Sequence, residues 1–150
     1  MQSNLNPSAR TSVVAVIDPD AYAAGTYVTG WVDMRTWFAL LALISVGDFV
    51  ATGVLNAKIQ QATDAAGTGA KDVAGLAITA LTQAGADDNK QALINLFPSD
   101  LDFNNGFCFV RLSMTLTVAG ADAAGYLLGL SPRYGDAQAN DAATVDEVVS

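Results

Sequence analysis

Alternation of apolar and polar residues is the clearest pattern in this chain, and it predicts β-strands. The longest example covers residues 107–118. Its apolar positions are Cys108, Val110, Leu112, Met114, Leu116 and Val118, and its polar positions are Arg111, Ser113, Thr115 and Thr117. A period of two with β-branched residues at polar positions is typical of a half-buried strand. Shorter stretches of the same pattern predict strands over 54–62 and 91–97, and Pro98 should end the second.

Weaker patterns predict three further strands. Residues 12–17 form a short apolar run that Asp18-Pro19-Asp20 should end as a turn. Residues 26–34 contain strand-forming aromatic and β-branched side chains but break at Gly30. Residues 126–130 follow a turn region expected over 120–125 and precede Pro132.

Two segments fit either a strand or a helix. Residues 37–46 are apolar on both faces, which suits a strand buried on both sides or a short core helix. We favour a strand that Gly47-Asp48 ends. Residues 72–84 have apolar positions at helical spacing after Asp72, but Gly75, Thr79 and Thr82 weaken a helix, so a strand is predicted there too.

Strands at this spacing, joined by polar loops of small residues, predict an all-β fold, either an antiparallel β-sandwich or a jelly-roll-like barrel. We expect one sandwich domain over 12–130, with extended arms over 1–11 and 131–150. The C-terminal segment is either a frayed tail or an arm that orders against a neighbouring subunit. Val145, Val148 and Val149 would give such an arm apolar groups with which to dock.

The composition argues against an enzyme. The 150 residues include no histidine, one cysteine and one glutamate. Catalysis usually needs a group that titrates near neutrality or an activated nucleophile. A site built from aspartates alone therefore ranks last among the hypotheses. Cys108 lies between Phe107 and Phe109 and is expected to be a buried, inert thiol. One cysteine without histidine excludes the usual zinc sites, and no metal or cofactor is expected.

The charge excludes two classes of partner. The net charge is −8, and the seven basic residues are spread singly, which argues against binding to nucleic acid or an anionic membrane. The most apolar stretch, 37–44, is far shorter than the roughly 20 residues of a membrane-spanning helix. The N-terminus lacks the basic-then-apolar layout of a secretion signal, so we expect a soluble protein made in a cytoplasm.

Two segments resemble ligand-binding loops but are better explained as turns. Residues 100–106 place oxygens at alternate positions, as a calcium loop does. That loop needs glycine sixth and an acid twelfth, where this chain has Asn105 and Arg111. Residues 67–71 resemble a phosphate loop, but Ala70 separates the second glycine from Lys71, and Asp72 follows.

Short segments spread over most of the chain carry a family resemblance. They are residues 6–10 (NPSAR), 18–22 (DPDAY), 29–34 (TGWVDM), 56–64 (NAKIQQATD), 67–72 (GTGAKD), 105–107 (NGF) and 133–135 (RYG). In these segments the chain resembles small structural proteins of tailed bacteriophages and prophages. None of the segments is a catalytic motif.

The resemblance implies a virion protein on the capsid surface, specifically a decoration or cement protein. Such a protein forms a homo-oligomer, with a trimer favoured, and binds the major capsid protein. A head–tail connector, tail or fibre-associated subunit is the alternative. A carbohydrate-binding module that uses Trp31, Trp37 or Tyr134 is a third hypothesis. For the two tryptophans, roles in the core or in subunit contacts are favoured. The residues predicted to contact the capsid or another subunit are Pro7, Ser8, Ala9, Arg10, Arg133, Tyr134, Val145, Val148 and Val149.

Overall fold

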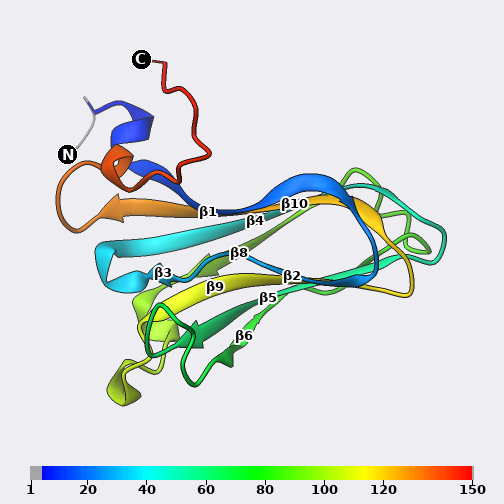
Figure 1. The fold of residues 1–150 in the computed structure, drawn as a ribbon, viewed down its shortest axis with the longest axis horizontal. Coiled ribbons are helices and arrows are strands. Elements are labelled where there is room, and N and C mark those ends of the chain that lie inside the picture. The colour runs from blue at the N-terminus through cyan, green and yellow to red at the C-terminus, as the bar shows by residue number, and fades with distance from the viewer. Residues whose placement is uncertain (1–4, 150) are drawn as a thin grey trace.

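Two antiparallel β-sheets lie face to face in the computed structural model, which describes residues 5–149 (Figure 1). The strands are β1 (Thr11–Tyr22), β2 (Gly25–Val28), β3 (Val32–Asp33), β4 (Trp37–Phe49), β5 (Val54–Ala62), β6 (Lys71–Ala77), β7 (Leu81–Thr82), β8 (Gln91–Leu96), β9 (Phe109–Thr117) and β10 (Ala121–Pro132). Short 3-10 turns cover Pro7–Ala9, Met34–Thr36, Pro98–Asp100, Phe103–Asn105 and Ala137–Asn140. Within the described part of the chain, no helix has the length and apolar character needed to cross a membrane.

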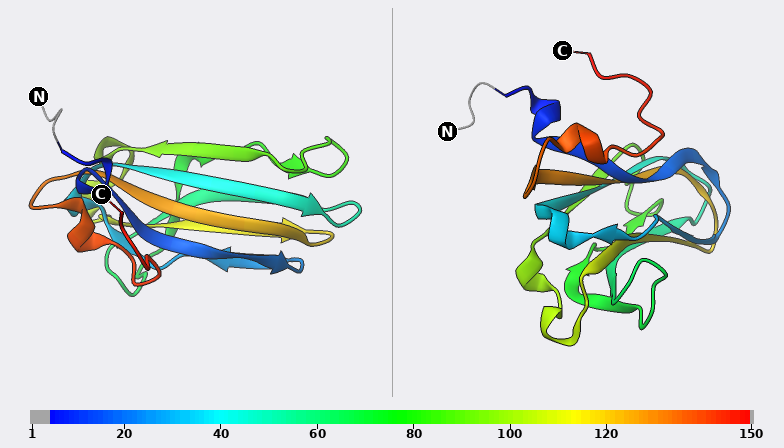
Figure 2. Two further views of the ribbon diagram at one scale, coloured as in Figure 1. Left: turned by 90° about the horizontal axis from the view of Figure 1, so that it is seen from above. Right: turned by 60° about the vertical axis from the view of Figure 1, so that its left-hand side comes forward.

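The strand order is that of a jelly roll. One sheet has the order β1-β10-β4-β8 and the other β2-β9-β5-β6, with β3 beside β9 and β7 beside β5. All strand pairs are antiparallel, and the chain crosses between the sheets after most of the long strands (Figure 2). Eight main strands in two such sheets define a double-sheet jelly roll. The predicted all-β antiparallel sandwich is therefore confirmed.

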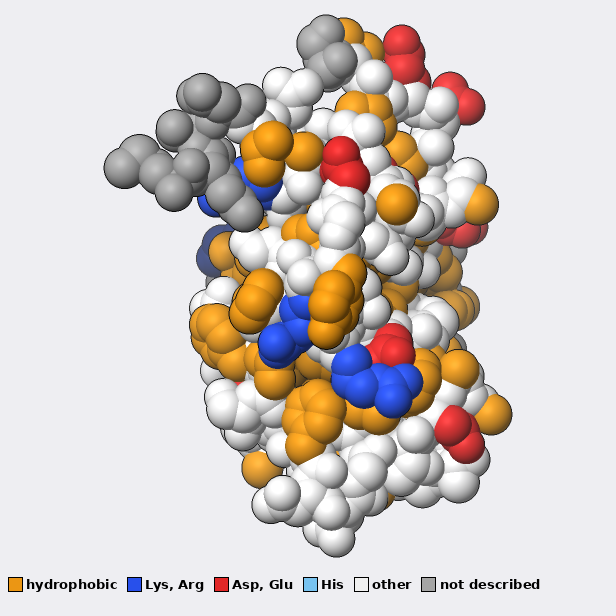
Figure 3. Space-filling model, turned by 90° about the vertical axis from the view of Figure 1, so that its left-hand side faces the viewer, with side chains coloured by type: hydrophobic (Ala, Val, Ile, Leu, Met, Phe, Trp, Pro, Cys, Tyr) orange, Lys and Arg blue, Asp and Glu red, His pale blue; other side chains and the backbone are white. Residues whose placement is uncertain are grey.

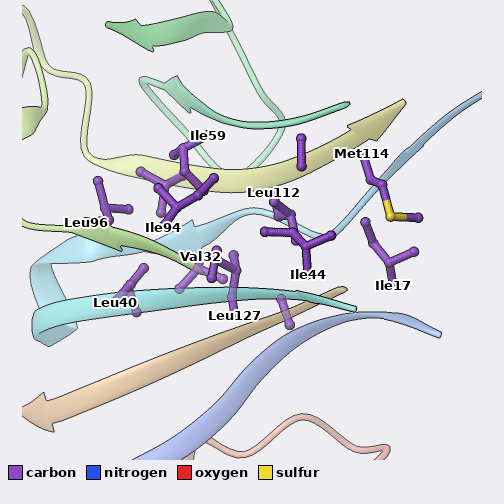
Figure 4. Packing of buried hydrophobic residues seen from close by; sticks show 14 of the residues in the cluster. Ile17, Val32, Leu40, Ile44, Ile59, Ile94, Leu96, Leu112, Met114 and Leu127 are labelled. Carbon is purple, nitrogen blue, oxygen red and sulfur yellow. The ribbon is translucent and has the colours of Figure 1, made fainter. Parts of the chain in front are cut away.

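The core fills the space between the sheets (Figure 4). Leu40 and Ile44 of β4 and Leu127 of β10 project from one sheet toward Leu112 and Met114 of β9 on the other, and all five are at most 1% exposed. Alternate residues of each strand enter this layer, because successive side chains point to opposite faces of a sheet.

Three predicted strands are confirmed with the faces that alternation assigns. β9 buries Val110, Leu112, Met114 and Leu116, and β5 buries its predicted apolar positions in the same way. β8 buries two of its three predicted apolar positions, and the third, Ala92, is partly buried against the core. The exception is Val118, which is 75% exposed and has φ 71°, because it lies in the turn that follows β9.

The predicted turn at Asp18-Pro19-Asp20 is wrong, because β1 continues through it to Tyr22. β1 is an edge strand, and its register against β10 shifts between Ile17 and Asp20. Proline is tolerated at such a place because the missing N–H faces away from the sheet or falls in a bulge.

Two predicted strand ends are also wrong. β4 continues beyond Gly47-Asp48 to Phe49, which pairs with Ala121. β10 accordingly begins at Ala121, inside the region expected to be a turn. Gly125 is a packing position there, because a Cβ on it would lie 2.8 Å from Leu112 Cδ2.

The two segments of uncertain class are strands. Residues 72–84 contain most of β6 and all of β7, and residues 37–46 lie within β4. Residues 26–34 divide at Gly30 into β2 and β3. β4 was expected to be buried on both sides, but only its inner side is buried. Leu41 and Leu43 on its outer side stay partly exposed.

Candidate interaction surfaces

The outer side of the β1-β10-β4-β8 sheet is unusually apolar. Cross-strand pairing places Leu128 beside Leu41, and it places Tyr126, Leu43 and Leu93 in one row across β10, β4 and β8. With Leu130, we call these residues the apolar face. Leu93 is 59% exposed, and the other members are partly exposed. Six large side chains on a solvent-facing side form the kind of patch that marks an interaction site.

The outer side of the opposite sheet is polar, as a solvated sheet face should be. It carries Lys58 and Gln60 on β5 beside Ser113 and Arg111 on β9, and Arg111 Nε donates a 3.0 Å hydrogen bond to Gln60 Oε1. The two sheets thus differ in chemistry on their outer sides, although both contribute to one core.

Basic side chains stack on aromatic rings at one end of the sandwich, which we call the arginine–aromatic end. The cationic groups of these pairs lie 3.9–5.5 Å from the ring centroids. The pairs are Arg35 with Phe109, Lys71 with Phe107, Arg111 with Trp31, and Arg133 with Phe38. Figure 3 shows blue and orange side chains gathered on this end. A cation over a ring face is attracted by the ring quadrupole, which favours these stacked positions.

A shallow groove of about 410 Å³ opens at this end between Arg35, Pro98, Phe103, Arg133 and Tyr134. Arg133 Nε donates to the Trp37 carbonyl at 3.1 Å, while Tyr134 is 82% exposed. Asp33 forms a 2.7 Å ion pair with Arg35, and hydrogen bonds from Arg35 lower the pKa of Asp33. Arginine and exposed aromatics are enriched where proteins bind one another.

The opposite end of the sandwich is acidic. The loops and strand ends there carry Asp18, Asp20, Asp48, Asp87, Asp88 and Asp122, with Lys90 as the basic residue among them. Asp87 pairs with Lys90 at 2.9 Å, and that bond lowers the pKa of Asp87. The chain is therefore polarised, and an acidic partner would meet less repulsion at the arginine–aromatic end.

The N-terminal segment that carries four of the predicted contact residues touches the C-terminal segment. Pro7, Ser8 and Ala9 form a 3-10 turn, followed by Arg10, and Ser8 Oγ accepts a 2.7 Å hydrogen bond from Gln138 Nε2 (Figure 1). Both described termini lie on the same side as the arginine–aromatic end, where Arg133 and Tyr134 sit. Met1 to Asn4 and Ser150, which belong to the two predicted arms, lie outside the described residues.

The C-terminal segment packs against β1 of its own chain. Asp141 Oδ1 accepts hydrogen bonds from Ser12 Oγ at 2.7 Å and from the Val13 amide at 3.0 Å, and the Ala142 amide donates to the Val13 carbonyl. Ala137 is fully buried. Beyond these contacts, Val145 is partly exposed, and Val148 and Val149 are 42% and 85% exposed.

Sequence reasoning missed two parts of these surfaces. No local pattern distinguishes Asp141 from the other aspartates of the C-terminal segment. Its hydrogen bonds to β1 could therefore be identified only from the folded structure. The apolar face did leave a signal, since residues 37–46 are apolar on both faces.

Carboxylates in the loop over 97–106 hold turns together. Asp102 accepts from Lys71 Nζ at 2.6 Å and from Asn105 Nδ2, and these donors lower its pKa. Asp100 accepts from the Phe97 amide at 2.7 Å. Within residues 5–149, no cluster of three or more histidine, cysteine, aspartate or glutamate side chains is placed to hold a metal ion.

The tryptophans form no exposed platform. Trp37 is 1% exposed and lies against Gly129 in the core, which removes it as a sugar-binding surface. Trp31 is half-buried, with Arg111 over its ring. Cys108 is buried, as predicted.

Comparisons with known proteins give remote likenesses. No protein-family profile matches the chain, and no curated protein matches its sequence. A chain in the structure of infectious bursal disease virus Gx strain is 14% identical, with a TM-score of 0.44 over 88% of this chain and 38% of that one. A chain in the structure of a Cowpea Mosaic Virus empty virus-like particle is 10% identical, with a TM-score of 0.42 over 91% of this chain and 89% of that one. The function of this chain is therefore inferred from its own surfaces.

Proposed function

We propose that this chain is a structural protein of a virus particle and acts by binding rather than by catalysis. Within that class, it is a decoration or cement protein that forms a homo-oligomer and attaches to the major capsid protein on the outside of the head. The observation that carries the proposal is the arginine–aromatic end, where Arg133 and Tyr134 line a groove beside both terminal segments.

Three further features support a binding role. A jelly roll is an architecture used by capsid and lectin domains, although a fold alone does not assign a function. The apolar face offers a second surface for association. The sequence resemblance to structural proteins of tailed bacteriophages supplies the class of particle. Many weak contacts, repeated over a shell, would give strong overall attachment.

Attachment to empty heads tests the proposal. The heads are assembled from the major capsid protein encoded nearest to this gene, and bound chain is measured by co-sedimentation. Tyr134→Ala and deletion of residues 1–10 should each weaken attachment at least tenfold, because a truncated central aromatic contact costs about 1–2 kcal/mol or more. Asp48→Lys, at the acidic end, is the matched control and should attach normally.

The outcomes separate the hypotheses. Full attachment by both variants, with unchanged thermal unfolding, overturns this end as the attachment surface, and failure of the wild-type chain to bind heads overturns the decoration role. A copy number per particle that fits one ring instead of the whole shell identifies a head–tail connector. Binding on a glycan array that Tyr134→Ala abolishes supports the carbohydrate-binding alternative, because Tyr134 is the exposed aromatic of the groove.

A further inference from the structure

The outer edge of β8 is an open strand edge. β8 lies at the end of the order β1-β10-β4-β8 and pairs with β4 from Leu40–Leu96 to Ser45–Gln91 without a register shift. Its residues are Gln91, Ala92, Leu93, Ile94, Asn95 and Leu96, and none is charged. Seen from above, β8 forms one margin of its sheet (Figure 2). Such an edge is a template for another strand.

The other sheet edges carry features that oppose pairing. β1 contains Pro19 and two register shifts, and the C-terminal segment bonds to it through Asp141. β6 begins with Lys71 and Asp72, and its register with β5 shifts between Lys58 and Gln60. β2 has only four residues. Charges, prolines, bulges and short length are the usual protections of an edge strand. β8 has no charged residue, no proline and no bulge.

The register identifies the backbone groups that β8 presents. The Val46 amide donates to the Lys90 carbonyl at 3.0 Å, in phase with the pairing of Ile44 with Ala92. Bonded pairs alternate with non-bonded pairs in an antiparallel ladder. Even-numbered residues of β8 therefore bond to β4, and Gln91, Leu93 and Asn95 direct their N–H and C=O groups outward.

We propose that β8 of a second copy of this chain occupies this edge in antiparallel orientation, with Leu93 of one copy opposite Leu93 of the other. The pairing is two-fold, so each copy supplies the donors and acceptors that the other needs. It joins the two β1-β10-β4-β8 sheets into one. The proposal deepens the proposed function, on whose self-association it rests, by naming the contact.

A second copy fits this edge on charge and on side-chain chemistry. The chain has a net charge of −8, so copies repel one another where carboxylates face each other. β8 contains no carboxylate and therefore brings none into the contact. The row formed by Tyr126, Leu43 and Leu93 meets its own copy at the two-fold axis. The apolar face then runs across both chains, and Leu93 loses its exposure to water.

The size of the contact sets its strength. A six-residue edge is smaller than a typical stable interface, which buries about 1,200–2,000 Å². The free chain is therefore expected to pair weakly and at high concentration, and more completely when many copies are held on one surface. A two-fold contact differs from the trimer that the family resemblance implies, and native mass spectrometry distinguishes the two by subunit count.

Cross-linking of purified chain tests the contact without any capsid. Leu93→Cys is made with Cys108→Ala, so that the new thiol is the only one. Bonded antiparallel partners have Cα atoms about 5.5 Å apart, within the range of about 4.4–6.8 Å that a disulfide spans. We expect mild oxidation, or a short bismaleimide, to give a covalent dimer at least tenfold faster than the control. The control is Ala74→Cys on β6, an exposed alanine at the edge of the other sheet.

A measurement on the wild-type chain covers the case in which the variants fold poorly. The amides of Gln91, Leu93 and Asn95 should exchange with deuterium more slowly as protein concentration rises, and Leu93→Lys should remove that dependence. Equal cross-linking of the two cysteine variants, or concentration-independent exchange of these amides, overturns the proposal. Because capsid attachment is measured separately by co-sedimentation, its failure does not affect this result, and failure of the dimer leaves the attachment test intact.

Discussion

Replacing Asp141 with alanine should release the C-terminal segment from β1. The substitution removes the carboxylate oxygen that accepts from Ser12 Oγ and from the Val13 amide, and Ser12 is 1% exposed. A hydrogen bond to a charged group contributes about 1.5–3 kcal/mol. Because Asp141 is only partly buried, we expect the two bonds together to stabilise the docked segment by about 2–3 kcal/mol.

Hydrogen exchange at the Ala142 amide measures this release directly. That amide donates to the Val13 carbonyl at 2.7 Å, so it is protected only while the segment is docked. A loss of about 2–3 kcal/mol corresponds to exchange roughly 30- to 150-fold faster. Limited proteolysis should cut after residue 142 in the same variant, while the urea midpoint of the sandwich changes less.

Two variants make the result specific. Asp141→Asn keeps a neutral acceptor in the same place and should lose only about 1 kcal/mol. Asp146→Ala removes a carboxylate from the same segment that accepts no hydrogen bond from the described residues, and it should exchange like the wild type. If Asp141→Ala exchanges no faster than Asp146→Ala, the docking of this segment on its own chain is refuted.

Two other predictions concern stability. Gly129→Ala should lower the urea midpoint by an amount equivalent to about 1–3 kcal/mol, because the added Cβ would lie 2.5 Å from the Trp37 ring. Gly30→Ala is the control, because a Cβ on Gly30 meets open space and should leave the midpoint unchanged. Equal midpoints for the two variants would contradict this packing. Lys71 lowers the pKa of Asp102 below its ordinary 3.8, so this carboxylate stabilises the fold above that pH and loses its contribution as the pH falls through the folded pKa. Urea midpoints should therefore fall as the pH drops from about 5 toward 3, less steeply in Asp102→Asn, and an equally steep fall in that variant would contradict this role of Asp102.

Local patterns predicted the strands whose two sides differ in polarity. In β9, apolar residues enter the core while Arg111 and Thr115 face out, so the period of two is visible in the sequence. β10 begins with Ala121, Asp122, Ala123, Ala124 and Gly125, a sequence typical of a turn. Asp122 is exposed, but the other four residues are buried, and Gly125 packs against Leu112 of the opposite sheet. Its true start depended on pairing with Phe49, which lies far away in the chain.

The surfaces were predictable only in part. Pro19 misled the prediction of β1 because the sequence does not reveal that this strand lies at an edge, where proline is tolerated. The groove at the arginine–aromatic end joins residues from three connections, so no local spacing could indicate it. Arg133 and Tyr134 were selected from the C-terminal segment alone, and their contact role stays a prediction.

The isolation of β8 as the unprotected edge limits how far assembly through it can proceed. When β8 pairs antiparallel with β8 of a second copy across a two-fold axis, the open edges of both copies are occupied at once. Growth by this route therefore stops at a pair, and the described edges that remain, with their bulges, charges or short length, do not extend the sheet into a fibre. At high protein concentration, the open β8 edge therefore leads to dimers and not to open-ended association of the sheets.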